Sequence, residues 1–131
     1  MADLNLLTAA TGQTPTLGTH LVTKDYVDTS HNQVAVNTVT GSTTLSLSIE
    51  MLRVNASTGA TITVPTNASV AFPVGTRRWV RRAGTANVSV VGASGVTINW
   101  PTGSFIITTQ YAMAELVKVG TDLWDGLLLG N

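Results

Sequence analysis

YAMAELVKVGTDLWDGLLL, residues 111–129, is the stretch that decides the fold class of this chain. Both halves of it are rich in apolar residues that favour β-strands. Between them, Gly120, Thr121 and Asp122 have the composition of a turn. We therefore predict strands over residues 111–119 and 123–129.

Short runs of the same kind continue upstream as far as Gln33. Within residues 43–50, Leu45, Leu47 and Ile49 alternate with Ser and Thr, as expected for a strand with one buried face. Further strands are predicted over residues 51–55, 60–65, 75–82, 86–91, 96–100 and 104–109. Their regular spacing, with turn residues between them, predicts an all-β domain at residues 33–131, an antiparallel β-sandwich of jelly-roll type.

The first 32 residues have a different composition, with many Thr, Gly and Asn residues and no clear period. We predict an extended N-terminal arm over residues 1–32 that contains a short helix at about residues 24–30. Thr23 can cap the start of this helix, and Asp25 lies in its first turn, where the helix dipole favours negative charge. A helix of about two turns is unstable alone in water, so it needs a surface to pack on.

Charged residues make up only 11% of the 131-residue chain, and the formal net charge is zero. A typical domain has about a quarter, so part of the uncharged surface is expected to be buried against other chains. No global field attracts nucleic acid or an anionic membrane. No apolar run approaches the roughly 18 residues of a membrane helix, and the N-terminus does not resemble a secretory signal. We therefore expect neither nucleic acid nor a membrane as a partner.

Few residues have the pattern of a catalytic or metal site. The chain has no cysteine, and its two histidines, His20 and His31, both lie in the arm without metal-ligand spacing. Asp122 and Asp125 could form a glycosidase pair, but a turn residue and a strand-face residue are the simpler interpretation. We expect no enzyme activity and no cofactor or metal.

One strongly charged segment, RRWVRR at residues 77–82, contains four of the seven cations: Arg77, Arg78, Arg81 and Arg82. Because strand residues alternate, both faces of this strand carry arginine. An unpaired buried charge is costly, so at least one face must meet carboxylates or water. The segment could be an edge strand protected by charge, or a contact with another subunit or partner through carboxylate pairs. Nucleic-acid binding is the weakest alternative. Glu115, in the middle of a predicted strand, is the expected carboxylate partner.

Two stretches resemble phage structural proteins. LVTKDYVD, residues 21–28, resembles a segment of phage tail-fibre, collar and head-fibre proteins that often precedes a trimeric β region. Residues 60–130 resemble a β-sandwich module near the ends of such proteins. The resemblance implies a homotrimer, in which Leu21 and Tyr26 would contribute contacts, with the arm used for virion attachment or trimerisation.

The resemblance implies a structural protein of the bacteriophage virion. Fibre proteins are usually longer than this chain, which favours a head-decoration (cement) protein that binds the major capsid protein, or another virion protein, and stabilises the assembled head. Cementing works by mass action, because binding only the assembled state favours that state. The alternative is a tail-fibre or receptor-binding module that contacts a glycan on the bacterial surface. A depolymerase-like glycosidase is a third and weaker reading.

Overall fold

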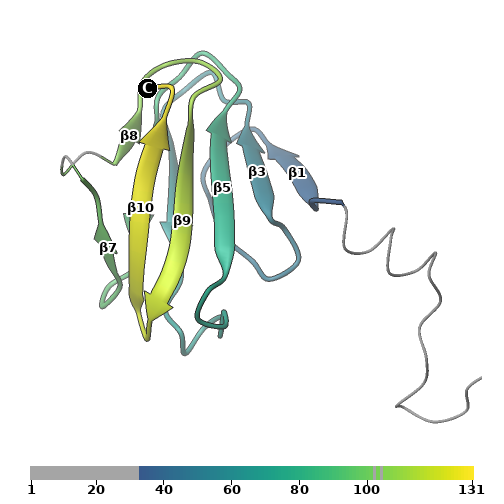
Figure 1. Cartoon of the computed structure of the whole chain (residues 1–131). Helices are drawn as coiled ribbons and strands as arrows, with labels where there is room; N and C mark the ends of the chain where they lie inside the picture. Colours follow the sequence, from purple (N-terminus) through teal and green to yellow (C-terminus); the bar gives the residue numbers. More distant parts are fainter. Residues whose placement is uncertain (1–32, 102, 104) are drawn as a thin grey trace, which may run out of the picture. The chain divides into compact units, whose positions relative to one another are not determined.

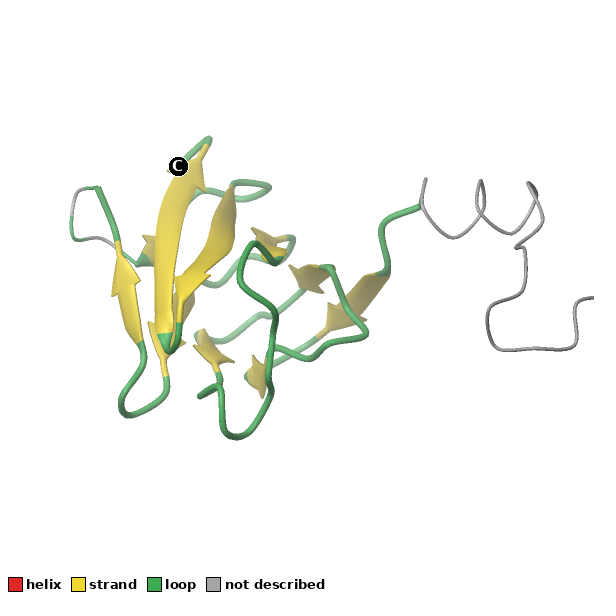
Figure 2. Cartoon of the chain, turned by 60° about the horizontal axis from the view of Figure 1, so that its bottom comes forward, coloured by secondary structure: helices red, strands yellow, loops and turns green. Residues whose placement is uncertain are grey.

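Two β-sheets face each other across a shared core in the computed structural model, which describes residues 33–101, 103 and 105–131 (Figure 1). The larger sheet has the strand order β1-β3-β5-β9-β10-β7 and the smaller one β2-β4-β6-β8. No helix occurs among these residues (Figure 2). The predicted arm and short helix, with Leu21 and Tyr26, lie outside the described residues. The ten strands are β1 (Val36–Val39), β2 (Thr43–Thr44), β3 (Met51–Val54), β4 (Ala60–Val64), β5 (Arg77–Arg82), β6 (Val88–Gly92), β7 (Thr97–Asn99), β8 (Ile106–Ile107), β9 (Met113–Gly120) and β10 (Leu123–Leu129).

The first six strands wind as a short coil, because consecutive strands alternate between the two sheets. Each turn of the coil adds one strand to each sheet, so β1, β3 and β5 are parallel neighbours, as are β2, β4 and β6. The later strands extend both sheets through antiparallel pairs: β9 is antiparallel to β5 and β10, and β8 is antiparallel to β6. β7 lies parallel to β10 at the edge of the larger sheet.

The prediction of two sheets in an all-β domain is confirmed, but the prediction that they are antiparallel is wrong for most strand pairs. Of the eight pairs among the described residues, five are parallel and three are antiparallel. Parallel strands need a long crossover connection, and here the strand in the opposite sheet serves as that crossover. This connectivity gives no support to the jelly-roll prediction.

The core contains the inward side chains of both sheets, as the period of two predicts. In β4 the inward Ala60, Ile62 and Val64 are buried while Thr61 is exposed. Full burial of one such Val, Ile or Leu side chain is worth roughly 1.5–3 kcal/mol. The largest fully buried side chains are Trp124, Ile62, Ile107, Leu116, Val54, Val64, Val80, Val88 and Val90.

Most predicted strands are present, but the one over residues 43–50 is not. Only Thr43 and Thr44 pair, in β2. Leu45 then enters the core and donates its N–H to the carbonyl of Thr63 at 3.0 Å, after which the chain turns and leaves Leu47 56% exposed. β1 was not predicted, because its exposed residues lack a regular apolar alternation.

Candidate interaction surface

The arginine segment forms β5, which lies inside the larger sheet between β3 and β9 (Figure 1). The interpretation of RRWVRR as an edge strand is therefore wrong. Alternation along β5 is confirmed: Arg78 and Arg82 point into the domain with Val80, and each is only 7% exposed. Arg77 and Arg81 lie on the opposite, outward face with Trp79.

Arg78 uses backbone carbonyls as partners. Its guanidinium donates to the carbonyl oxygens of Ser46 at 3.4 Å, Leu47 at 2.9 Å and Arg77 at 2.7 Å. It also lies 4.8 Å from the ring centroid of Phe72, a cation–π distance. Burial lowers the pKa of Arg78 from its ordinary value, and the carboxylate of Glu50 acts in the opposite direction. The contacts hold the turn after β2 against the larger sheet.

Arg82 has the same role at the other end of β5. Its Nε donates to the carbonyl of Gly84 at 3.2 Å, and its Nη1 donates to Asn87 Oδ1 at 3.3 Å and to the carbonyl of Thr108. Its Nη2 donates to the carbonyl of Thr85. One guanidinium thus joins the β5–β6 loop to the segment after β8.

Lys118 is a third buried cation, which the sequence analysis did not single out. It is 3% exposed, and its Nζ donates to Asn67 Oδ1 at 2.6 Å and to the carbonyl of Phe72 at 2.7 Å. Its position in the alternation of β9, on the inward side with Ala114 and Leu116, was the available signal. These contacts fix the long loop between β4 and β5.

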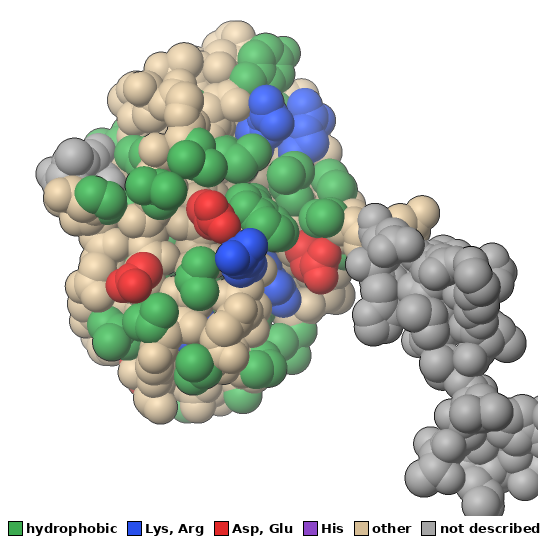
Figure 3. Space-filling view, viewed as in Figure 1, with side chains coloured by type: hydrophobic (Ala, Val, Ile, Leu, Met, Phe, Trp, Pro, Cys, Tyr) green, Lys and Arg blue, Asp and Glu red, His purple; other side chains and the backbone are tan. Residues whose placement is uncertain are grey.

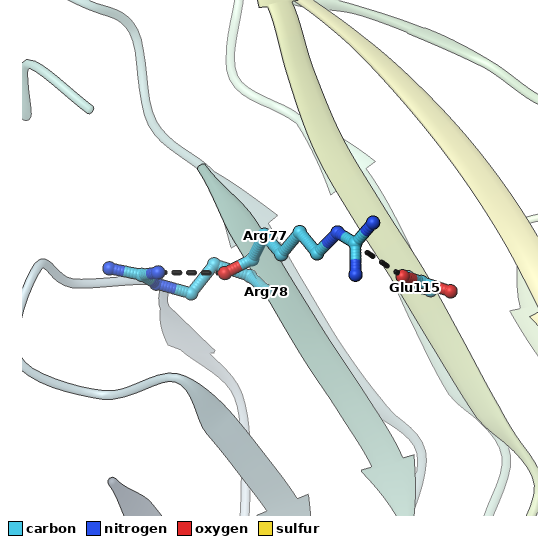
Figure 4. A network of polar contacts seen from close by, with 3 residues as sticks. All are labelled: Arg77, Arg78 and Glu115. Carbon is cyan, nitrogen blue, oxygen red and sulfur yellow. Dashed lines mark hydrogen bonds and ion pairs between the residues drawn. The ribbon is translucent and has the colours of Figure 1, made fainter. Parts of the chain in front are cut away.

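On the outward face, Arg77 and Glu115 form the predicted carboxylate pair within one chain (Figure 4). Arg77 Nε lies 3.9 Å from Glu115 Oε2, with the arginine side chain 63% exposed and the glutamate 24%. An exposed pair at this distance contributes little stability. Arg81 lies 6.0 Å from the ring centroid of Tyr111.

The outward side chains of the larger sheet line up in rows across its strands, and we call this surface the outer face. One row is set by the register of β1, β3, β5, β9 and β10 and comprises Val36, Met51, Trp79, Glu115 and Leu127. The adjacent row comprises Thr38, Arg53, Arg81, Met113 and Leu129. On the other side of the first row lie Arg77, Val117, Asp125 and Asn99. Figure 3 shows several groups of apolar side chains on this side of the molecule, with charged side chains among them.

A polar groove lies at the end of the domain near Arg82. Its volume is about 440 Å³. Hydroxyl, amide and backbone groups line it: Thr40, Asn55, Ala56, Ser57, Ala83, Gly84, Thr85 and Gln110. Such a lining can form hydrogen bonds but offers no titratable side chain for catalysis.

The two aspartates weighed as a glycosidase pair have the simpler positions. Asp122 lies in the β9–β10 turn with φ 54°, and its Oδ1 accepts the N–H of Asn67 at 2.6 Å. Asp125 is exposed on β10 and accepts Asn99 Nδ2 at 3.0 Å. In the part of the chain that the structure describes, no three His, Cys, Asp or Glu side chains gather as metal ligands. Because the described residues form no helix, they offer no candidate for a membrane-spanning helix.

The structure brings together only some of the predicted interface residues. Arg77, Arg81 and Glu115 share the outer face, whereas Arg78 and Arg82 are buried and hold loops. Comparison with known proteins adds no assignment, since no family model matches the chain and no curated protein matches it.

Proposed function

We propose that this chain is a structural protein of a bacteriophage particle, and that it decorates and stabilises the assembled head as an oligomer. The observation that carries the proposal is the outer face, where Met51, Trp79 and Leu127 lie in one row on an outward sheet surface. Neighbouring apolar side chains on an outward surface are typical of protein contacts. The resemblance of residues 21–28 and 60–130 to phage structural proteins supplies the kind of particle.

The described residues also support a binding role over a catalytic one. Asp122 is engaged by the backbone of Asn67, and Asp125 by the side chain of Asn99. These contacts agree with a turn residue at Asp122 and a strand-face residue at Asp125 rather than with a hydrolytic pair. Adhesion through a surface requires no such groups.

The experiment is to purify particles that contain the chain, quantify it by mass spectrometry and locate it with a labelled antibody by electron microscopy. Head decoration predicts many copies spread over the head. It also predicts that particles stripped of the protein lose their contents at a lower temperature, because bound protein favours the intact shell. Absence of the chain from purified particles would contradict the proposal.

The arm can be tested with the same particles. Deletion of residues 1–32 is expected to leave a β-rich domain, because the described core lies within residues 45–124, and to abolish attachment. Circular dichroism checks the fold, and sedimentation with stripped particles measures attachment. Unchanged attachment of the truncated chain would assign the anchor to the β domain.

A tail-fibre or receptor-binding module is the second candidate, and the polar groove favours it. Asn55, Ser57 and Gln110 present amide and hydroxyl groups suited to hydrogen bonds with a glycan. In this case the antibody label would be confined to the tail, and the purified chain would bind host cells. Added surface polysaccharide would compete for that binding.

A further inference from the structure

We propose that the outer face binds a second copy of this chain, through contact of its arginine-bearing side with the carboxylate-bearing side of the neighbouring copy. The inference rests on the proposed oligomer and names the surface that forms it. It goes beyond that proposal because it specifies which strands meet.

The apolar row is the first part of the argument. Val36 is 53% exposed at one end of the row and Leu127 is 44% exposed at the other, with Met51 and Trp79 half-buried between them. Glu115 is the single charged member of this row. Because the row crosses five strands, a flat partner surface can cover it without any change in the sheet. Removal of such side chains from water favours association.

The charges on the outer face are separated by strand, which is the second part. Arg53 lies on β3, and Arg77 and Arg81 lie on β5. The outward carboxylates, Glu115 and Asp125, lie on β9 and β10. The β3–β5 half therefore has an excess of positive charge, although Glu50 lies directly before β3, and the β9–β10 half carries the two outward carboxylates, with the apolar row running through both.

This separation favours a second copy over other partners. When the β3–β5 half of one copy meets the β9–β10 half of another, opposite charges face each other, which favours correct register. Nucleic acid or an anionic membrane would meet Glu115 and Asp125 as well as the arginines, so neither is complementary to the whole face. Two copies related by a two-fold axis satisfy both halves at once, and repetition of a head-to-tail contact gives a closed ring, such as a trimer, where the rotation closes.

The guanidinium groups of Arg53 and Arg81 can donate hydrogen bonds in such a contact. No carboxylate of the described residues lies within ion-pair distance of Arg53 or Arg81. The guanidinium of Arg81 lies 6.0 Å from the ring centroid of Tyr111. A guanidinium at an interface forms two parallel hydrogen bonds to a carboxylate, and Asp125 of a neighbouring copy offers one.

The test uses the full chain and light scattering coupled to gel filtration over a range of protein concentrations. Leu127→Glu places a charge in the apolar row. Leu47→Glu is the matched control, because Leu47 is 56% exposed in the turn after β2 and lies outside the rows. We expect the dissociation concentration of the oligomer to rise at least about tenfold for Leu127→Glu, the factor that 1.4 kcal/mol represents. The control should associate like the wild type.

Charge exchange gives a second test that does not depend on Leu127. Asp125→Arg and Arg81→Glu should each weaken association, and the chain with both changes should recover part of it, because the two exchanged charges again attract each other across the contact. Circular dichroism and urea unfolding of each variant separate loss of contact from loss of fold.

The outcomes distinguish this inference from the proposed function. An oligomer that survives Leu127→Glu and both single charge reversals would overturn the inference and leave the oligomeric role intact. A wild-type chain that stays monomeric at all concentrations would overturn the inference, and binding to particles would then decide the proposed role separately. If monomers bind particles and Leu127→Glu abolishes that binding, the outer face meets the capsid and the self-contact is refuted.

Discussion

Replacement of Arg82 by Lys should destabilise the fold strongly, although the charge is kept. The guanidinium uses three different nitrogens: Nε for Gly84, Nη1 for Asn87 and Thr108, and Nη2 for Thr85. Lysine has donors on one terminal nitrogen only. It cannot replace the Nε bond, and its ammonium cannot occupy both Nη positions, so at least two bonds are lost.

The magnitude follows from those two bonds. Hydrogen bonds to charged groups contribute roughly 1.5–3 kcal/mol each, so their loss costs about 3–6 kcal/mol. A domain of this kind has a total stability of about 5–15 kcal/mol. With a urea dependence of about 1–3 kcal/mol per molar, a loss of about 3 kcal/mol lowers the urea midpoint by at least about 1 M.

Arg81→Lys is the matched control, since it is the same change one residue earlier on the opposite face. The side chain of Arg81 has no hydrogen bond to another described residue, and lysine can keep a cation near Tyr111. We expect a change below about 0.5 kcal/mol, as for surface substitutions in general. Tryptophan fluorescence in urea measures both variants, and a repeat at higher protein concentration separates any effect of association from the stability of the fold.

Equal midpoints for the two lysine variants would refute the reasoning. It would mean that the carbonyl oxygens around Arg82 are satisfied by water or by a single ammonium group. A large effect of Arg81→Lys that is independent of protein concentration would equally contradict the assignment of the two faces of β5.

Two further predictions concern the loops and the outward ion pair. Gly84→Ala should destabilise by about 1–3 kcal/mol because the added Cβ would overlap the carbonyl oxygen of Ala56. Gly59→Ala, whose added Cβ meets nothing within 4 Å, should change the melting temperature little. A double-mutant cycle of Arg77→Ala and Glu115→Gln should give a coupling energy below about 1 kcal/mol in urea unfolding, because the pair is solvent-exposed; a coupling of several kcal/mol would contradict this assignment.

Strand positions were predictable because they depend on local signals. Turn residues and the period of two placed β10 at residues 123–129 with its correct bounds, and placed β3 and β4 to within one residue. Residues 43–50 show where this logic fails. Leu45, Leu47 and Ile49 alternate well, yet only Leu45 is buried, because the turn after β2 is held by Arg78 from a strand more than 30 residues away.

The pairing of the strands was not predictable in the same way. Whether β3 lies beside β1 in parallel or beside β4 in antiparallel depends on contacts between segments far apart in sequence. Short strands with turn residues between them suit both arrangements. The partners of Arg78 and Arg82 could not be predicted for a related reason. Their acceptors are mainly backbone carbonyls of loops, and every residue has such a carbonyl, so the sequence does not mark them.

The burial of three cations means that the surface of the domain carries less charge than the composition suggests. Three of the seven lysines and arginines, Arg78, Arg82 and Lys118, lie inside the domain and bind loop carbonyls. They serve the coil of parallel strands, whose loops leave carbonyl oxygens pointing inward that need donors. The exterior is therefore poorer in charge than the figure of 11% indicates. Solubility of a monomer depends on surface charge, so the burial of these three cations leaves the described domain with less surface charge, which agrees with the proposed contact between copies.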